Sequence, residues 1–402
     1  MSSTDGFDSD DFTFRMSSIA HQMMGQPMFQ VIDRVRSMED AGRDVVHLEI
    51  GEPDFETPSN ISAAAVKAII DGDTHYVSSW GVREFREASA RATQRSRGFK
   101  PDLEQVLVTP GANIATFLTI LTLVNPGEEV LYPDPGFPTY EASVRAAGVS
   151  GVRYELDHHN EFRISADSIA EKITDKSRLI IVNSPSNPTG AVTREPELRR
   201  VFELASANDL YVFSDEIYAR MIYGDAFFSM GSIDMARERV IVSNGFSKAF
   251  AMTGWRLGVV IGPARVMERM MLLLQTTLSC VPPFVQRAGT AALEEDQSQV
   301  GQMMDVYRRR RDFVVEEVNS IPGLSSPVPG GAFYLFPSIA ETGLSSSEFS
   351  ERLLNEKAVA VLPGHNFGPA GDGYIRISFA TSEERLSEGL GRIRSFCEKL
   401  KQ

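Results

Sequence analysis

The chain has 402 residues, 42% of them hydrophobic, and a formal net charge of −14. This length exceeds the usual size of one hydrophobic core, so we expect two domains that share one site. The negative charge argues against a nucleic-acid partner, because phosphate backbones attract clustered Lys and Arg. A basic run at residues 308–311 lies in a helical stretch, and we expect it to be a solvated face with ion pairs.

The N-terminus is acidic, with several aspartates among Ser and Gly, which predicts a disordered tail over residues 1–14. A basic start followed by an apolar core, the mark of secretion, is missing, and no apolar stretch has the length of a membrane span. The thiols of Cys280 and Cys397 are far apart and fit a reducing cytosol, so a cytoplasmic protein is expected. Neither the cysteines nor the histidines have metal-ligand spacing, so no metal site is expected.

Short apolar runs separated by helical stretches occupy the middle of the chain. They are Gln105–Thr109, Glu129–Tyr132, Leu179–Asn183, Leu210–Ser214 and Val240–Val242. Such runs with helices between them predict a mostly parallel sheet covered on both faces, which is the α/β class. Ligands of open α/β sheets bind beyond the carboxyl ends of the strands, so we expect the site there.

The last third of the chain has a different pattern. Its apolar runs are Ala332–Phe336, Val359–Leu362 and Tyr374–Phe379, and helical stretches and Gly/Pro turns separate them. This pattern predicts a second, smaller α+β domain.

One lysine stands out because of its neighbours. Lys248 follows the run Val240–Val242, with Ser247 directly before it and Arg256 eight residues after it. An amine in a pocket can form a Schiff base with an aldehyde, and a hydroxyl and a guanidinium can hold a phosphate. Together these groups suit pyridoxal phosphate (PLP). On these residues alone, a Ser-Lys pair at a strand end without any such role remains an alternative.

Other landmarks accompany the segment Gly245–Gly258. They are Gly51–Phe55, Tyr76 with Gly81, Asn187–Gly190, Ser214–Tyr218 and Arg376. In this order, and from about residue 15 to the C-terminus, the chain resembles the class I/II PLP-dependent aminotransferases, and within them the bacterial aspartate/aromatic subgroup. The resemblance implies an enzyme that moves the α-amino group of an L-amino acid to a 2-oxo acid by a ping-pong mechanism.

The family's architecture refines the expected fold. The resemblance implies a large PLP-binding domain over residues 61–300, with a mostly parallel sheet of the seven-stranded type flanked by helices. A smaller α+β domain would come from both termini, residues 15–60 and 301–402. It also implies a homodimer with shared active sites, in which Tyr76 reaches the neighbour's phosphate. A surface tyrosine is the alternative reading of Tyr76.

The resemblance assigns cofactor contacts to several residues. Lys248 would hold PLP as a Schiff base, and Asp215 would face the protonated pyridine nitrogen. A structural salt bridge is the alternative for Asp215, since a buried carboxylate needs a cationic partner. Tyr218 and Asn187 match the residues that hydrogen-bond the ring's 3-hydroxyl. Phe137 matches the aromatic residue that stacks on the ring, with an ordinary core Phe as its alternative.

A phosphate site is expected at Gly111, Ala112 and Asn113, which end a strand and open a helix. Backbone N–H groups and the helix dipole make such an end an anion site, although a plain tight turn would have the same sequence. The family binds the PLP phosphate here, and Ser247 and Arg256 would complete the cradle. Gly245 replaces a second hydroxyl that close relatives use on the phosphate.

Arg376 is expected to bind the substrate. It is an odd residue in a period-two strand, and a two-point contact with an α-carboxylate explains it. Gly51 would let that carboxylate approach the backbone. Once freed by the incoming amino acid, Lys248 would carry the proton from Cα to C4′ of the cofactor, with Asp215 and Tyr218 supporting catalysis.

The side-chain specificity stays open. Subgroup members that take acidic substrates often have a lysine at the position of Asn113, which cannot supply the charge, so aspartate is in doubt. Phe137 stands where tryptophan is commoner, and Met28, Phe29 and Ile50 can add apolar surface. These features suit an aromatic, aliphatic or methionine-like donor.

Two rival functions follow from the same residues. A PLP lyase or synthase that eliminates at Cβ or Cγ would use every landmark above. A PLP-sensing transcription regulator would need a basic helix-turn-helix extension, and the chain instead starts with a short acidic tail.

Overall fold

The computed structural model describes residues 16–23, 25, 27–224, 227–234 and 237–401. The tail predicted for residues 1–14 lies outside the described residues. Within them, no helix combines the length and the hydropathy that a membrane span requires.

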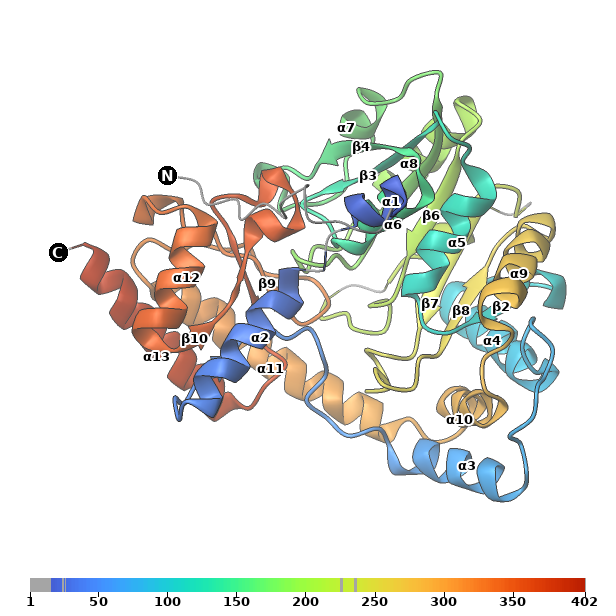
Figure 1. Cartoon of the computed structure of the whole chain (residues 1–402), viewed down its shortest axis with the longest axis horizontal. Coiled ribbons are helices and arrows are strands. Elements are labelled where there is room, and N and C mark those ends of the chain that lie inside the picture. The colour runs from blue at the N-terminus through green and yellow to red at the C-terminus, as the bar shows by residue number, and fades with distance from the viewer. Residues whose placement is uncertain (1–15, 24, 26, 225–226, 235–236, 402) are drawn as a thin grey trace.

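A seven-stranded sheet forms the centre of the larger part of the molecule (Figure 1). Its strand order is β2-β8-β7-β6-β5-β3-β4. Only β8 runs antiparallel to its neighbours β2 and β7, and the other pairs are parallel. The strands are β2 (Val106–Thr109), β3 (Glu129–Asp134), β4 (Ser150–Glu155), β5 (Ser177–Asn183), β6 (Tyr211–Asp215), β7 (Val240–Gly245) and β8 (Gly258–Ile261). The expected mostly parallel sheet is therefore confirmed.

Helices cover both faces of this sheet, as its continuous apolar strands require. Alternate residues of a strand point to opposite faces, so Ile180 and Leu179 of β5 belong to different core clusters. On one face pack α5 (Asn113–Leu123), α6 (Thr139–Ala147) and α9 (Ala264–Leu278). The other cluster holds side chains of α3 (Ser59–Ile70), α4 (Arg83–Arg97), α7 (Ala166–Ala170), α8 (Glu195–Ala207) and α10 (Pro283–Glu294).

A smaller α+β part is built from both ends of the described chain. Strand β1 (Val46–His47) pairs in parallel with β10 (Val359–Ala360), and β12 (Ile375–Ser378) lies between β11 (Leu362–Pro363) and β9 (Tyr334–Leu335) in an antiparallel sheet. Its helices are α2 (Pro27–Asp40), α12 (Ser346–Lys357) and α13 (Glu383–Leu400). The short helix α1 (Ser18–Gln22) instead lies beside α6 of the larger part (Figure 1).

The long helix α11 (Ser298–Ser320) connects the two parts (Figure 1). It carries the basic run at 308–311, and the prediction that this run is a solvated face is wrong for Arg310. Arg310 is only 6% exposed, and both of its terminal nitrogens donate to the carboxylate of Asp54, each at 2.8 Å. Arg308 does lie on an exposed face and pairs with Asp305 at 2.9 Å.

Three of the described strands, β1, β4 and β8, have no counterpart among the apolar runs of the sequence. β4 is an edge strand with mostly exposed or half-buried residues, so it lacks the apolar run of a buried strand. β8 has four residues and follows the lysine segment directly. Each of the predicted apolar runs contains or overlaps an observed strand.

Candidate active site

Residues from several strand ends meet in one cavity of about 420 Å³, a size typical of small-molecule sites. Asn113 follows β2, Asp215 ends β6, and Lys248 follows β7 by three residues. Asn187 comes after β5, and Arg376 reaches the cavity from β12 of the smaller part. The site therefore lies where the sheet topology predicts it, between the two parts of the molecule.

Lys248 presents its amine inside the cavity. Its Nζ donates a hydrogen bond to the main-chain oxygen of Gly51 at 2.5 Å and lies 5.8 Å from the ring centre of Phe333. Burial, followed by the nearby charge of Arg376, lowers the pKa of this amine to about 8. A larger neutral fraction near neutral pH makes the amine a better nucleophile and base than an exposed lysine.

The lysine loop is fixed at its base. Phe246 N donates to Leu257 O at 3.1 Å, and Met252 N donates to Ser247 O at 3.2 Å. Below these bonds, Gly245 pairs with Gly258 in the β7–β8 ladder. The backbone of the loop that carries Lys248 is therefore held by hydrogen bonds on both sides of that residue.

Asp215 contributes a carboxylate to the lining of the cavity. It is 8% exposed, and it accepts hydrogen bonds from Tyr140 Oη at 2.7 Å and from Ile217 N at 3.2 Å. Burial raises the pKa of Asp215 to about 6, while the bonds from Tyr140 and Ile217 oppose that rise. A buried carboxylate of this kind suits a cationic group of a bound ligand.

Arg376 is 2% exposed and is held from two sides. Its Nη1 donates to Asn187 Oδ1 at 3.1 Å, and its Nη2 donates to the main-chain oxygen of Glu49 at 2.6 Å. The guanidinium lies 4.4 Å from the ring centre of Tyr334. Its Nε has no hydrogen-bond partner within the described part of the chain. Further N–H donors are thus left for a carboxylate in the cavity.

One group of residues in the cavity lining has the features of an anion site. Ala112 and Asn113 at the start of α5 line it together with Ser247 and Arg256. Gly111 has a φ of +84°, and a Cβ there would lie 2.5 Å from Arg256 Nη2. Only glycine therefore lets this guanidinium approach the helix start, where backbone N–H groups favour an anion.

The remaining predicted residues differ in their placement. Gly51, Phe137 and Tyr218 line the cavity, and a Cβ on Gly51 would lie 2.5 Å from Tyr334 Oη. Tyr76 does not line it and is 88% exposed in the single chain.

Two tyrosines of the site were not singled out from the sequence. Tyr140 bonds Asp215 at 2.7 Å, and the hydroxyls of Tyr334 and Tyr218 lie 2.8 Å apart. Tyr140 closes the segment Pro135–Tyr140 that contains Phe137, and this proximity was the one available signal. Tyr334 lies in the apolar run 332–336, where it has the pattern of a core residue.

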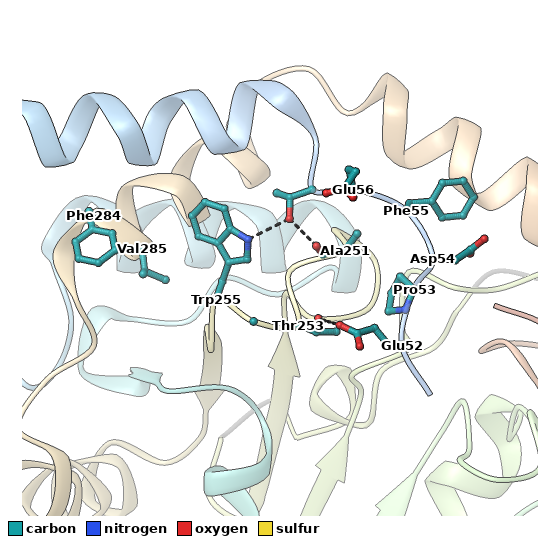
Figure 2. Close-up of a pocket in the computed structure, with 12 residues that line it drawn as sticks. Glu52, Pro53, Asp54, Phe55, Glu56, Ala251, Thr253, Trp255, Phe284 and Val285 are labelled. Carbon is teal, nitrogen blue, oxygen red and sulfur yellow. Dashed lines mark hydrogen bonds between the residues drawn. The ribbon is translucent and has the colours of Figure 1, made fainter. Parts of the chain in front are cut away.

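An open pocket of about 710 Å³ adjoins the cavity (Figure 2). Thr57 Oγ1 donates to Ala251 O at 2.6 Å and accepts from Trp255 Nε1 at 3.0 Å. Thr253 donates to Glu52, as Figure 2 shows. The segment that carries Gly51 is therefore bonded to the lysine loop at several points.

Comparisons with known proteins agree with this geometry. The family model described as aminotransferase class I and II matches residues 43–393. An aspartate aminotransferase of Pyrococcus horikoshii is 41% identical over 372 residues, which is 92% of this chain and 94% of that protein. Aromatic-amino-acid aminotransferase 2 of Thermococcus litoralis is 41% identical over 361 residues, covering 89% of this chain and 92% of that protein.

A solved structure has the same fold. The aspartate aminotransferase of Thermus thermophilus with maleate superposes with a TM-score of 0.91 at 34% identity, covering 95% of this chain and 99% of that one. The chain belongs to the aminotransferase class I and II family. It is an aminotransferase, and members of this family use PLP. Nothing in the family or its relatives favours the elimination alternative.

Proposed function

We propose that the chain binds PLP in the 420 Å³ cavity and moves the α-amino group of an L-amino acid to a 2-oxo acid. The observation that carries this proposal is the convergence of the Lys248 amine, the Asp215 carboxylate and the Arg376 guanidinium on that cavity. When bound, PLP supplies an aldehyde that condenses with amines and a ring that withdraws electrons.

The residues present fit this cofactor. Asp215 is a buried carboxylate suited to a protonated ring nitrogen, and Lys248 offers an amine with a lowered pKa. Asn113, Ser247 and Arg256 are assigned to the phosphate, together with Gly111 and Ala112, because this end of the cavity joins a helix start to a guanidinium. Phe137 is assigned to the face of the ring, and Tyr218 and Asn187 to its hydroxyl.

Each side chain of the site then has a separate role in binding or in proton transfer. Arg376 binds the α-carboxylate of the amino acid and Gly51 leaves it room, so that Cα lies within reach of Lys248. Lys248 Nζ would take the proton from Cα and deliver it to C4′ of the cofactor. Proton transfer of this kind accelerates a reaction roughly 10²–10⁴-fold. Asp215 would pair with the protonated ring nitrogen, and the hydrogen bond from Tyr140 favours its ionised form.

Amino transfer and elimination differ in their products, which gives the test. Holoenzyme mixed with an L-amino acid and no acceptor is expected to release one equivalent of 2-oxo acid per subunit and then stop. Addition of a second 2-oxo acid should restart the reaction. Continuous release of ammonia would contradict the proposal and favour a lyase.

We also propose that the preferred donor has an apolar or aromatic side chain. The cavity is lined by Met28, Phe29, Ile32, Ile50 and Phe137, and Asn113 adds no charge. A panel of donors should therefore give the highest kcat/KM with aromatic, leucine-like or methionine-like amino acids. A clear preference for aspartate would contradict this assignment.

We further propose a cytoplasmic homodimer with shared active sites. Apolar side chains are exposed on α3 and after it, including Val66, Ile69 and Ile70 at 56, 47 and 78% and Tyr76 at 88%. Such a patch marks an interaction surface, and light scattering on the purified protein checks the dimer. Cys280 and Cys397 are both free thiols, as in a reducing compartment; cell fractionation checks the location.

The domain division at about residues 60 and 300 is likewise a proposal. Arg376 and Gly51 come from the smaller part, whereas Lys248 and Asp215 come from the larger one. A carboxylate bound to Arg376 would therefore contact both parts. Crystal structures of the holoenzyme with and without such a ligand test whether the two parts move as units with these boundaries.

A further inference from the structure

Glu49 is a carboxylate that the proposed function does not use. Its side chain is fully buried, and its Oε2 has no hydrogen-bond partner among the residues that the structure describes. An unpaired buried charge is costly, so this position requires a compensating cation. Glu49 directly precedes Ile50 and Gly51, which line the active-site cavity. The chain therefore leads directly from Glu49 into the lining of the cavity.

His47 supplies the compensating cation. Its Nδ1 lies 2.8 Å from Glu49 Oε1, and its Nε2 lies 2.9 Å from Glu39 Oε1 on α2. Both ring nitrogens face carboxylate oxygens. A neutral imidazole has one N–H donor, so both nitrogens can donate at the same time only when the ring is protonated. The hydrogen bond with Glu49, followed by the one with Glu39, raises the pKa of His47 to about 9 against the effect of burial. His47 is therefore cationic at neutral pH.

Glu49 also contacts Arg376. Its main-chain oxygen accepts the shorter of the two hydrogen bonds of that side chain, at 2.6 Å from Nη2. The negative charge of Glu49 acts on Arg376 as well, since it opposes the lowering of the Arg376 pKa by burial. The adjacent Leu48 O accepts from Ser378 N at 2.7 Å, which ties this segment to the strand of Arg376.

We propose that His47 and Glu49 are positioning residues for the substrate α-carboxylate. The His47–Glu49 ion pair fixes the main-chain oxygen that orients Arg376, and His47 offsets the charge of Glu49. Arg376 then meets the carboxylate with its orientation set and without a competing anion. This inference rests on the proposed role of Arg376.

The signs of the charges separate this role from simple packing. His47→Gln leaves a buried anion uncompensated beside Arg376, where it competes with the substrate carboxylate. Glu49→Gln in the same chain removes that anion and keeps the backbone. The His47→Gln/Glu49→Gln double variant should therefore recover much of the carboxylate affinity that His47→Gln loses. If the two substitutions only disturbed packing, their losses of affinity would add.

The test measures equilibrium binding of 3-phenylpropanoate and of the matched neutral alcohol, 3-phenylpropan-1-ol, to the holoenzyme. The wild-type enzyme should bind the acid more tightly than the alcohol, and Arg376→Lys should abolish that difference. This comparison tests the role of Arg376 separately from that of His47 and Glu49. His47→Gln should weaken binding of the acid about tenfold, as expected for coupled neighbours, and leave binding of the alcohol unchanged. The double variant should return to within about threefold of wild type.

Two further variants keep the test decisive. His159→Gln makes the same change at an exposed histidine and should bind as wild type. If His47→Gln does not fold, His47→Asn also removes the cation, offers an amide donor in place of Nδ1, and should weaken acid binding in the same direction. Unchanged acid binding by folded His47→Gln, or a further loss in the double variant, would overturn the inference.

Discussion

Tyr140 donates a hydrogen bond to Asp215 across 2.7 Å, and the two side chains are 1% and 8% exposed. This bond opposes the rise in the pKa of Asp215 that burial causes. The carboxylate can therefore remain ionised near neutral pH although it is buried. The residue that favours the ionised form of Asp215 comes from α6, 75 residues away in the sequence.

Tyr140→Phe removes this donor and keeps the ring. Hydrogen bonds to charged groups contribute about 1.5–3 kcal/mol, so kcat should fall roughly tenfold or more. The acidic limb of the pH–rate profile should also move to higher pH, because Asp215 takes up its proton more readily. Tyr154→Phe is the matched control, since that buried hydroxyl donates to Ile181 O at 2.7 Å instead. An unshifted acidic limb in Tyr140→Phe would contradict this role.

Arg376→Lys should raise the KM of the amino donor strongly, because an ammonium cannot reproduce the two-point contact of a guanidinium. The loss should be large for amino acids and much smaller for the corresponding simple amines. Steady-state kinetics with both substrates measure it. Arg83→Lys, at an exposed arginine paired with Glu87, is the control. Equal losses of activity with amino acids and with simple amines would contradict carboxylate binding by Arg376 and indicate a purely structural role.

The free energy of unfolding should depend on pH because His47 binds its proton more tightly in the folded chain. Its pKa is raised from 6.5 to about 9 in the folded chain. The folded state therefore binds the proton more tightly, and the resulting stabilisation is complete below pH 6.5 and is lost as pH rises through about 9. Denaturant unfolding of wild type and His47→Gln between pH 6 and 10 should show the two curves converging at high pH. A constant difference between them would contradict the assignment.

The shared-site dimer is tested by subunit exchange between Tyr76→Ala and Lys248→Ala proteins. One site of the hybrid joins intact Lys248 and Arg256 on one chain with intact Tyr76 on the other. Its cofactor affinity should exceed that of the Tyr76→Ala homodimer. If exchange is confirmed and no gain appears, Tyr76 belongs to its own subunit's site or to none.

The sequence predicts the parts of this molecule that depend on local pattern. Apolar runs such as Leu179–Asn183 form buried strands, because short continuous stretches rich in β-branched residues favour a strand covered on both faces. The edge strand β4 shows no such run, and its side chains are largely exposed or half-buried. Pattern alone therefore could not separate it from a loop.

The contacts that shape the site depend on distance in space. Tyr140 and Asp215 are 75 residues apart, and Tyr218 and Tyr334 are 116 apart. The basic run alone predicts a solvated Arg310, because its partner, Asp54, is 256 residues away in the sequence. Only the packing of α11 against the segment that carries Gly51 brings that pair together.

The proposed function depends above all on the amine of Lys248, which is expected to hold the cofactor. Borohydride treatment of the holoenzyme, followed by proteolysis and mass spectrometry, tests it most directly. We expect pyridoxyl phosphate to be fixed on the peptide that contains Lys248, and we expect Lys248→Ala to bind the cofactor without covalent attachment and to lose turnover. Stable attachment to another lysine, or an active Lys248→Ala enzyme, would show that Lys248 does not hold the cofactor.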